Sequence, residues 1–324
     1  MPELPEAERA TRLLQKYLKD GLITAVDTIE DNIVYSDISH EEFAKELTNR
    51  TVLNAHRYGK VFWLELDAPT EESRHPVFHL GMTGMIQLQG QEPVWYRVRP
   101  KDASAWPPRF MKFIIHVTPP SGPAVHVAFT DARRLGRIRL RSNPCAQPPI
   151  IDLGFDPLLS MPSLPTFSSL MLKRNMPIKA LLLDQSFSAG VGNWVADEVL
   201  FHARIHPETR ANELRPEEVK RVWEKVRWVC EVAVGVDSDG SRFPSDWLFR
   251  FRWGKGKKST GKLLLPDGRE GTIRWITVGG RTSAYVEEVK EPDVEEEKNA
   301  EEELVLQRKV AKVCPMPFQN LDPY

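Results

Sequence analysis

The sequence has no long apolar segment and very little cysteine. Its 324 residues contain no run of 18 or more apolar residues, which argues against a membrane span. The three cysteines, Cys145, Cys230 and Cys314, lie far apart with no Cys-x-x-Cys pair, so we expect no disulfide framework, no zinc finger and a reducing compartment. The first residues also lack the basic and then apolar character of a signal peptide. We therefore expect no membrane partner.

The charge is nearly balanced overall but uneven along the chain. The net charge is −1, yet residues 287–324 carry 11 acidic and 5 basic side chains, which leaves +5 on residues 1–286. Residues 242–281 hold 10 basic and 3 acidic side chains. The same stretch contains six aromatic residues: Phe243, Trp247, Phe249, Phe251, Trp253 and Trp275. It is either an ordinary charged surface or a polyanion-binding face, for which we expect nucleic acid as the partner.

The hydrophobic pattern of the first half is mostly strand-like. About 20 residues at the start predict a helix, with acidic residues early and an apolar stripe before Gly21. From residue 22 to about 140, short apolar runs such as 61–66, 110–117 and 125–129 alternate with glycine and proline. This spacing predicts an antiparallel sandwich or barrel. No helix of adequate length separates the runs, which argues against a doubly wound parallel sheet.

The second half is mostly helical. It follows a proline-rich connector at residues 143–165, and its periodicity predicts helices near residues 166–174, 177–184, 193–203 and 216–234. Strand-like segments then surround a turn at Pro266-Asp267-Gly268, and the acidic run that follows is expected to be disordered. At about 150 residues per domain, the length agrees with more than one domain. The predicted fold class is α+β.

The N-terminus carries residues suited to nucleophilic chemistry. Removal of Met1 would expose the secondary amine of Pro2, and an unprotonated amine attacks electrophilic carbon to form an iminium, or Schiff-base, intermediate. A free α-amino group has a pKa of roughly 7.7–8.0, and the positive end of a following helix disfavours its protonated form. Glu3 and Glu6 are close enough in sequence for proton transfer. The alternative is a common second-position proline before an ordinary first helical turn.

Residues 1–6, Met-Pro-Glu-Leu-Pro-Glu, resemble the start of the formamidopyrimidine-DNA glycosylase family. Four further segments resemble family motifs in the same order. They are the lysine turn at residues 56–60, the methionine insertion loop at 79–84, the second insertion loop at 131–136, and the turn of the helix–two-turn–helix motif at 190–198. With the hairpin segments described below, the resemblance extends over residues 1 to about 286. Five segments in register are not expected by chance.

The resemblance implies catalytic roles for four of these residues. Pro2 would attack the sugar, and Glu3 would protonate the opened sugar and assist elimination. Glu6 would help to order the site, and Lys60 would assist release of the base. Without the resemblance, Lys60 is a solvated lysine at the start of a strand, the usual fate of this residue.

It also implies five DNA-binding residues. Met82, Arg133 and Leu135 would enter the base stack from two loops, as exposed apolar wedges do in other DNA-binding proteins. Asn193 at a helix start and Arg281 in a hairpin would contact phosphates. Without the resemblance, Met82 would be a core residue and Leu135 a hydrophobic lid. Arg133 and Arg281 would be ordinary surface arginines, and the turn before Asn193 a plain helix–turn–helix elbow.

Two features depart from the usual family pattern. Leu135 stands where a phenylalanine normally does, and Ala132 follows Asp131 in place of proline, which puts recognition of the opposite base in doubt. The four-cysteine zinc finger of bacterial members is also absent. Instead, residues 262–265, 266–268, 272–278 and 279–282 resemble the zincless-finger hairpin of plant and fungal relatives. We therefore expect no metal site and no cofactor. Glu198, on the same helix as Asn193, is expected to face the site.

The resemblance gives the predicted elements a domain plan. We expect an N-terminal catalytic β-sandwich with a flanking helix at residues 1–150, a linker at 151–165 and a helix–two-turn–helix domain at 166–240. A zincless finger would follow at 241–286, and an acidic, disordered tail at 287–324. The role of this tail stays open.

The function implied is that of a bifunctional DNA glycosylase and abasic-site lyase of base excision repair. It would remove oxidised purines such as 8-oxoguanine and formamidopyrimidines from damaged double-stranded DNA, through an N-terminal proline Schiff base and β,δ-elimination. An endonuclease VIII-like preference for oxidised pyrimidines, or a non-catalytic damaged-DNA-binding protein, are the alternatives. A monomer in the nucleus is expected.

Overall fold

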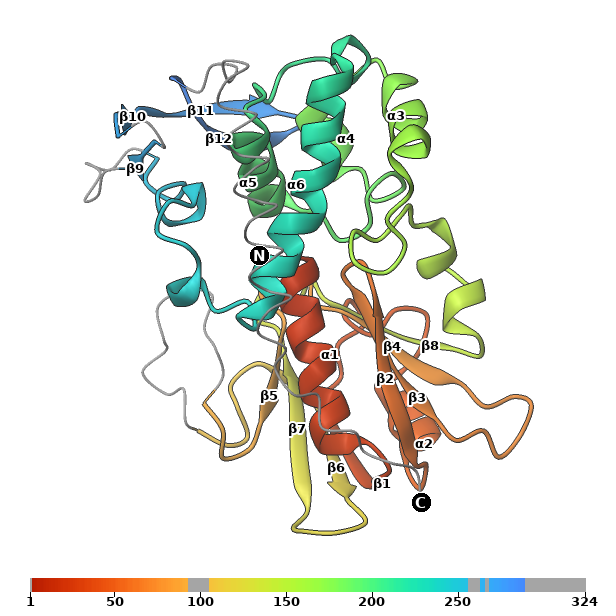
Figure 1. The fold of residues 1–324 in the computed structure, drawn as a ribbon. Helices are drawn as coiled ribbons and strands as arrows, with labels where there is room; N and C mark the ends of the chain where they lie inside the picture. The colour runs from red at the N-terminus through yellow and green to blue at the C-terminus, as the bar shows by residue number, and fades with distance from the viewer. Residues whose placement is uncertain (1, 93–104, 256–262, 266–267, 289–324) are drawn as a thin grey trace, which may run out of the picture. The chain divides into compact units, whose positions relative to one another are not determined.

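The computed structural model describes residues 2–92, 105–255, 263–265 and 268–288 (Figure 1). Residues up to Glu287 belong to one compact unit. The predicted tail from residue 289 onward and the Pro266-Asp267 part of the predicted turn lie outside the described residues. No helix in the described part of the chain is long and apolar enough to cross a membrane.

The described elements alternate much as the periodicity predicts. The helices are α1 (Leu4–Leu18), α2 (His40–Leu47), α3 (Leu164–Leu172), α4 (Ile178–Leu183), α5 (Asn193–Ala203) and α6 (Pro216–Gly235). The strands of the first half are β1 (Leu22–Thr28), β2 (Val52–Tyr58), β3 (Val61–Leu66), β4 (His75–His79), β5 (Met85–Leu88), β6 (Met111–Thr118), β7 (Val125–Thr130) and β8 (Arg137–Arg141). The last strands are β9 (Leu263–Leu264), β10 (Glu270–Gly271), β11 (Ile273–Val278) and β12 (Arg281–Val286).

The first half is an antiparallel sandwich, as predicted. Its two sheets have the strand orders β1-β6-β7-β5 and β2-β3-β4-β8, and every pairing within them is antiparallel. Apolar side chains from both sheets share one core, in which the rings of Phe62, Phe78, Phe113 and Phe129 stack or tilt against one another. Removing these rings from water supplies the main driving force for this half of the fold.

The prediction of strands alone between residues 22 and 140 is wrong at one place, because α2 lies between β1 and β2. Ser39 caps this helix, its Oγ accepting a hydrogen bond from the Glu42 amide at 3.1 Å. Phe43 and Leu47, four residues apart, are both buried in the sandwich core. The serine cap and the two apolar residues were visible in the sequence, but the helix has only 8 residues.

The second half forms a separate helical core around α4, α5 and α6. The predicted helix at residues 193–203 matches α5, which is buried along almost its whole length. Helix α1 packs against both β2 and α6 and so joins the two halves (Figure 1). Its apolar stripe, which includes Leu14 and Leu18, enters the sandwich core, while Leu4 belongs to the helical core. The start of α1 is therefore held between the two halves.

A β-hairpin of β11 and β12 follows the helical core. Its turn is made by Gly279 and Gly280, whose φ angles are +58° and +72°. Two consecutive positive φ angles are strained for residues with side chains, so the glycine pair allows a tight hairpin turn. Arg281 is the first residue of β12 and is exposed beside this turn.

Candidate active site

Three segments from distant parts of the chain meet at the start of α1. The Leu4 amide donates a hydrogen bond to the Gly190 carbonyl at 3.0 Å, which joins the N-terminus to the loop before α5. Gly59, in the turn between β2 and β3, lies against the same loop. A Cβ added at Gly59 would lie 3.1 Å from the Gly190 amide nitrogen, and one at Gly190 would lie 3.1 Å from the Gly59 Cα. The absence of side chains at both positions permits this close approach.

Glu3 is buried at this junction and caps α5 from another element. Its carboxylate accepts hydrogen bonds from the backbone amides of Trp194 at 2.9 Å and Val195 at 3.0 Å. These amides belong to the first turn of α5, whose positive end favours a negative group. Burial nevertheless raises the pKa of Glu3, while the positive charge of Lys60 opposes that rise. Glu3 is thus held in one position, and burial favours the protonated form of its carboxyl group.

Glu6 orders the residues in front of α1. Its Oε2 accepts a hydrogen bond from the Glu3 amide at 2.7 Å, and its Oε1 accepts one from the Ser238 hydroxyl at 2.8 Å. Pro2 is buried directly before this pair of carboxylates, and Met1 lies outside the described residues. Glu6 therefore holds the backbone amide that directly follows Pro2 in the chain.

Lys60 comes from the turn between β2 and β3 and reaches the same site. Its Nζ donates a hydrogen bond to the Val191 carbonyl at 2.9 Å. Burial lowers the pKa of Lys60, and the positive charge of Arg281 lowers it further, whereas Glu3 opposes the shift. Lys60, Glu3 and Arg281 are therefore close enough to influence one another electrostatically. The structure brings together these three predicted residues from separate parts of the sequence.

The turn that carries Lys60 is held by an ion pair that the sequence analysis did not identify. The Arg57 guanidinium pairs with the carboxylates of Asp156 and Glu8, and the Arg57 side chain is almost fully buried. Asp156 also accepts a hydrogen bond from the Gly59 amide at 2.7 Å. Because Asp156 is 97 residues from Gly59 and follows no recognisable motif, the sequence offers no signal for it.

Asn193 links α5 to the hairpin. Its Nδ2 donates a hydrogen bond to the Thr282 carbonyl at 2.8 Å, which holds the residue after Arg281. Its Oδ1 is buried and has no hydrogen-bond partner among the described residues. A buried acceptor without a partner is costly, so this atom is suited to accept a hydrogen bond from a bound group or water.

A second buried charge network, also missed by the sequence analysis, fixes the hairpin to α5. Asp197 accepts hydrogen bonds from Lys179, from the Arg252 guanidinium at 2.6 Å and from the Ala284 amide at 3.2 Å. Lys179 Nζ also donates to the Asn193 carbonyl at 2.8 Å. The network therefore connects α4, α5, the segment after α6 and β12.

The two predicted insertion loops are pinned side by side by Asp131. Its Oδ1 accepts a hydrogen bond from the Thr83 hydroxyl at 2.6 Å, and its Oδ2 accepts one from the Gly136 amide at 2.6 Å. A Cβ added at Gly81 would lie 2.4 Å from the Leu135 carbonyl carbon, so the loops are in direct contact.

The side chains proposed to enter DNA are accessible on these loops. Leu135 is 39% exposed, Arg133 is exposed and Met82 is half-buried. Exposed or half-buried apolar side chains on paired rigid loops are suited to act as wedges in a base stack.

Comparison with known proteins identifies the family. Residues 1–138 match the model of the formamidopyrimidine-DNA glycosylase N-terminal domain, and residues 153–245 match the formamidopyrimidine-DNA glycosylase H2TH domain. The formamidopyrimidine-DNA glycosylase of Arabidopsis thaliana is 40% identical over 291 residues, which are 90% of this chain and 71% of that protein. That of Pelotomaculum thermopropionicum is 33% identical over 88% of this chain and 97% of that protein. The chain belongs to the formamidopyrimidine-DNA glycosylase family.

Solved structures of this family share the fold. The crystal structure of the Lactococcus lactis enzyme, bound non-covalently to DNA containing an AP site, superposes with a TM-score of 0.67 at 23% identity. The match covers 90% of this chain and all of that one. A complex of the same enzyme with DNA containing an abasic site gives a TM-score of 0.69 at 24% identity. Family membership makes this chain a DNA glycosylase of base excision repair, with DNA as its partner.

The expectation that Glu198 faces the glycosylase site is wrong. Its carboxylate accepts hydrogen bonds from the Leu248 and Phe249 amides at 3.0 and 2.8 Å and contacts His202 at 3.0 Å. Glu198 therefore caps the short helical turn at Leu248–Arg250, on a different face of α5 from the Asn193 contact. Position on α5 was visible in the sequence, but the direction of the side chain was not.

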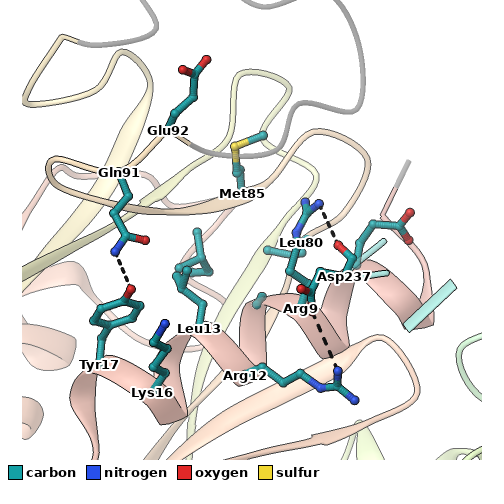
Figure 2. Close-up of a pocket in the computed structure, with 13 residues that line it drawn as sticks. Arg9, Arg12, Leu13, Lys16, Tyr17, Leu80, Met85, Gln91, Glu92 and Asp237 are labelled. Carbon is teal, nitrogen blue, oxygen red and sulfur yellow. Dashed lines mark hydrogen bonds and ion pairs between the residues drawn. The ribbon is translucent and has the colours of Figure 1, made fainter. Parts of the chain in front are cut away.

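A pocket of about 320 Å³ lies beside Glu6, between α1 and the residues that follow Leu80 (Figure 2). Arg9 and Arg12 reach Asp237 on one side, and Gln91 donates a hydrogen bond to the Tyr17 hydroxyl on the other. The pocket combines apolar walls with charged rims and provides free volume next to Glu6. Among the described residues, no cluster of three or more His, Cys, Asp or Glu side chains is arranged to hold a metal ion.

Proposed function

We propose that this DNA glycosylase removes oxidised purines and then cleaves the abasic site, with the imino nitrogen of Pro2 as the nucleophile once Met1 has been removed. The observation that carries the proposal is the hydrogen bond from the Glu3 amide, which directly follows Pro2, to the Glu6 carboxylate. Lys60 lies in the same site, and burial lowers the pKa of its ammonium group, which makes it a stronger proton donor. This set of groups is suited to attack at an anomeric carbon and to the proton transfers that follow.

The proposed reaction begins with attack of the Pro2 nitrogen on C1′ of the damaged nucleotide. The bond between C1′ and the base breaks, and the base leaves with the bonding pair and gains a proton, assisted by Lys60. The sugar ring opens to an iminium, and Glu3 delivers a proton to the ring oxygen. The raised pKa of Glu3 supports this role because it keeps the carboxyl protonated to higher pH.

The iminium then makes strand cleavage possible. Loss of a C2′ proton sends an electron pair toward the positively charged nitrogen, and the 3′-phosphate leaves in β-elimination. A second elimination releases the 5′-phosphate, and hydrolysis of the iminium restores Pro2. Glu6 keeps the N-terminal segment in position through its bonds to the Glu3 amide and the Ser238 hydroxyl.

The hairpin of β11 and β12 is proposed to act as a zincless finger. Arg281 would bind the phosphates that flank the lesion. The unpartnered Asn193 Oδ1 would accept a hydrogen bond from a bridging water or from another protonated group. Asn193 and Asp197 hold β12 through hydrogen bonds to its backbone, which supports this assignment. Met82, Arg133 and Leu135 are proposed to occupy the space left by the extruded nucleotide, since their two loops are in contact.

We also propose that the protein acts as a monomer in the nucleus. The similarity to the Arabidopsis thaliana enzyme supports a eukaryotic type of family member. Imaging of a fluorescent fusion, with the tag at the C-terminus to leave Pro2 free, tests the location. Light scattering with and without DNA tests the oligomeric state, and a stable dimer would contradict the proposal.

Borohydride trapping tests the nucleophile. The wild-type chain is expected to form a reduced covalent complex with a duplex containing an abasic site, and Pro2→Gly or a blocked N-terminus is expected to abolish it. Pro5→Ala, a substitution in the first turn of α1, is the matched control and should still be trapped. Peptide mapping of the cross-link should locate it on Pro2, and attachment at any other residue overturns the scheme.

A panel of duplexes tests the substrate class. Duplexes containing 8-oxoguanine or a formamidopyrimidine are expected to be cut faster than those containing an oxidised pyrimidine. The opposite order would assign the chain an endonuclease VIII-like preference. Binding without any cleavage or trapping would make it a damage-binding protein.

A further inference from the structure

Strand β8 presents three arginines on one face. Arg137, Arg139 and Arg141 alternate with Ile138 and Leu140, and the two apolar residues are buried in the sandwich core. Because side chains alternate across a strand, the three arginines share the opposite face. On this face Val77, the β4 partner of Arg139, packs against Ile150, and the three arginines are half-buried at its edge. Strand β8 is the edge strand of its sheet, next to β4 (Figure 1). We call these three residues the arginine stripe.

No carboxylate forms an ion pair with the stripe within the described part of the chain. Arg137 Nη1 donates to the Gly136 carbonyl and Arg141 Nε to the Pro148 carbonyl, both at 2.7 Å. Arg139 forms no hydrogen bond or ion pair to a described residue, although Asp37 is near enough to act on it electrostatically. A guanidinium has five N–H donors, so each half-buried arginine keeps donors that have no partner among the described residues.

The stripe begins beside the strands that lead to the active site. His79 on β4 pairs with Val61 on β3 and with Arg137 on β8, and Lys60 directly precedes Val61. Burial together with the positive charges of Lys60, Arg139 and Arg137 lowers the pKa of His79 to about 4. Neighbouring strands are about 4.8 Å apart, so Arg137 lies about 10 Å from Val61, and the stripe runs about 13 Å further along β8.

We propose that the arginine stripe binds the sugar–phosphate backbone of duplex DNA on one flank of the lesion and extends the footprint beyond the active site. The inference rests on the proposed function, since it takes damaged duplex DNA as the substrate. DNA rises about 3.4 Å per nucleotide, so 13 Å corresponds to about four nucleotides of one strand. Guanidinium groups bind phosphate oxygens in bidentate geometry, which suits a linear series of arginines.

The charge on this edge strand has a simpler explanation, which the experiment must distinguish from DNA binding. Charges on an edge strand also prevent pairing with other chains, whether or not DNA binds there. The test variant is Arg139→Gln/Arg141→Gln, which leaves Arg137 and the insertion loop unchanged. The matched control is Lys19→Gln/Lys45→Gln, which removes the same charge from exposed positions after α1 and in α2.

The measurement is the dissociation constant for a tetrahydrofuran-containing duplex at several salt concentrations. Three duplexes are compared. One has short flanks, and each of the other two extends a different flank of the lesion. On one of the two extended duplexes, the arginine variant should bind roughly 10- to 60-fold more weakly than the wild type near 0.1 M salt. On that duplex, the slope of log affinity against log salt concentration should be smaller in magnitude than that of the wild type by about 1 to 2. Binding to the short duplex should match that of the wild type, and the lysine control should match it on all three.

Three results would overturn the proposal. A variant with the same salt slope as the lysine control on every duplex has lost no phosphate contact. An equal loss on the short duplex would show that the substitutions disturb the active site instead. Aggregation of the variant with unchanged affinity would show that the arginines only protect the edge strand from pairing with other chains.

The proposed chemistry is tested separately by borohydride trapping on the short duplex. The arginine variant should be trapped as efficiently as the wild type. A wild-type chain that forms no cross-link, but whose affinity still depends on the stripe, would contradict the proposed nucleophile and leave the stripe proposal intact.

Discussion

The carboxylate of Glu3 and the backbone amide of Trp194 are joined by a hydrogen bond of 2.9 Å, although 191 residues separate them. This contact places the residue next to Pro2 against the first turn of α5, in the same turn that carries Asn193. The catalytic and the helix–two-turn–helix halves thus share one carboxylate. A disturbance at either end should therefore affect both chemistry and DNA binding.

Gly192→Ala should slow the enzyme strongly without unfolding it. The backbone of Gly192 has φ −126°, which alanine adopts freely, but the new Cβ would lie 2.3 Å from the Glu3 carboxyl carbon. Displacing Glu3 by about 1 Å should slow single-turnover cleavage of an 8-oxoguanine duplex by about 100-fold. Gly235→Ala is the control, because a Cβ there meets no atom within 4 Å. Equal rates for both variants would show that the position of Glu3 is unimportant.

Acidification should destabilise the protein partly through His79. Its pKa falls from 6.5 to about 4 on folding, so between these values the unfolded chain binds a proton that the folded chain does not. The stability contribution is present above pH 6.5 and is lost as the pH falls toward 4, by up to about 3 kcal/mol. Urea unfolding at pH 7 and pH 5 should show a smaller pH dependence for His79→Gln than for the wild type. His206→Gln, at an exposed histidine, should behave as the wild type.

Leu135→Phe should sharpen discrimination between the bases opposite the lesion. Leu135 is 39% exposed, so an aromatic ring fits without disturbing a core, and it can stack where leucine cannot. Aromatic stacking contributes about 0.5–1.5 kcal/mol beyond burial, which corresponds to a change of about 2- to 12-fold in the ratio of cleavage rates. Rates with each of the four opposite bases provide the measurement. An unchanged ratio would mean that Leu135 does not approach the opposite base.

Asp197→Asn should release the hairpin from α5. The substitution leaves the buried cations of Lys179 and Arg252 without their carboxylate, which costs about 3–5 kcal/mol for a buried pair. We expect a lower melting temperature and faster hydrogen exchange at the Ala284 amide, which donates to Asp197. Arg227→Gln, which breaks an exposed pair with Glu231, is the control and should change stability by less than about 1 kcal/mol. Unchanged exchange at Ala284 would contradict the role of Asp197.

Local features of the sequence determined much of the fold. The alternation of Ile138 and Leu140 with charged residues fixed the buried face of β8, and the pair Gly279-Gly280 fixed a tight hairpin turn. Helix α5 follows from its periodicity over residues 193–203. These features depend on neighbours within one strand or turn, so they are visible without the rest of the chain.

Candidate chemistry could also be found from residue type and order. Pro2, Glu3 and Glu6 stand together at the N-terminus, and Lys60 follows a turn glycine. Residue types alone could not give the direction of a side chain, as Glu198 demonstrates, because a helix presents each position to a different neighbour.

Only the tertiary structure decided which distant groups meet. Asp156 holds the turn at Gly59, and Asp197 holds β12 at Ala284, yet neither carboxylate differs in its local pattern from a solvated one. Their partners are selected by the packing of two cores against α1, and burial then makes each unpaired donor costly. The sequence by itself thus determined most of the elements and the candidate reactive residues, whereas long-range packing determined their contacts and their pKa shifts.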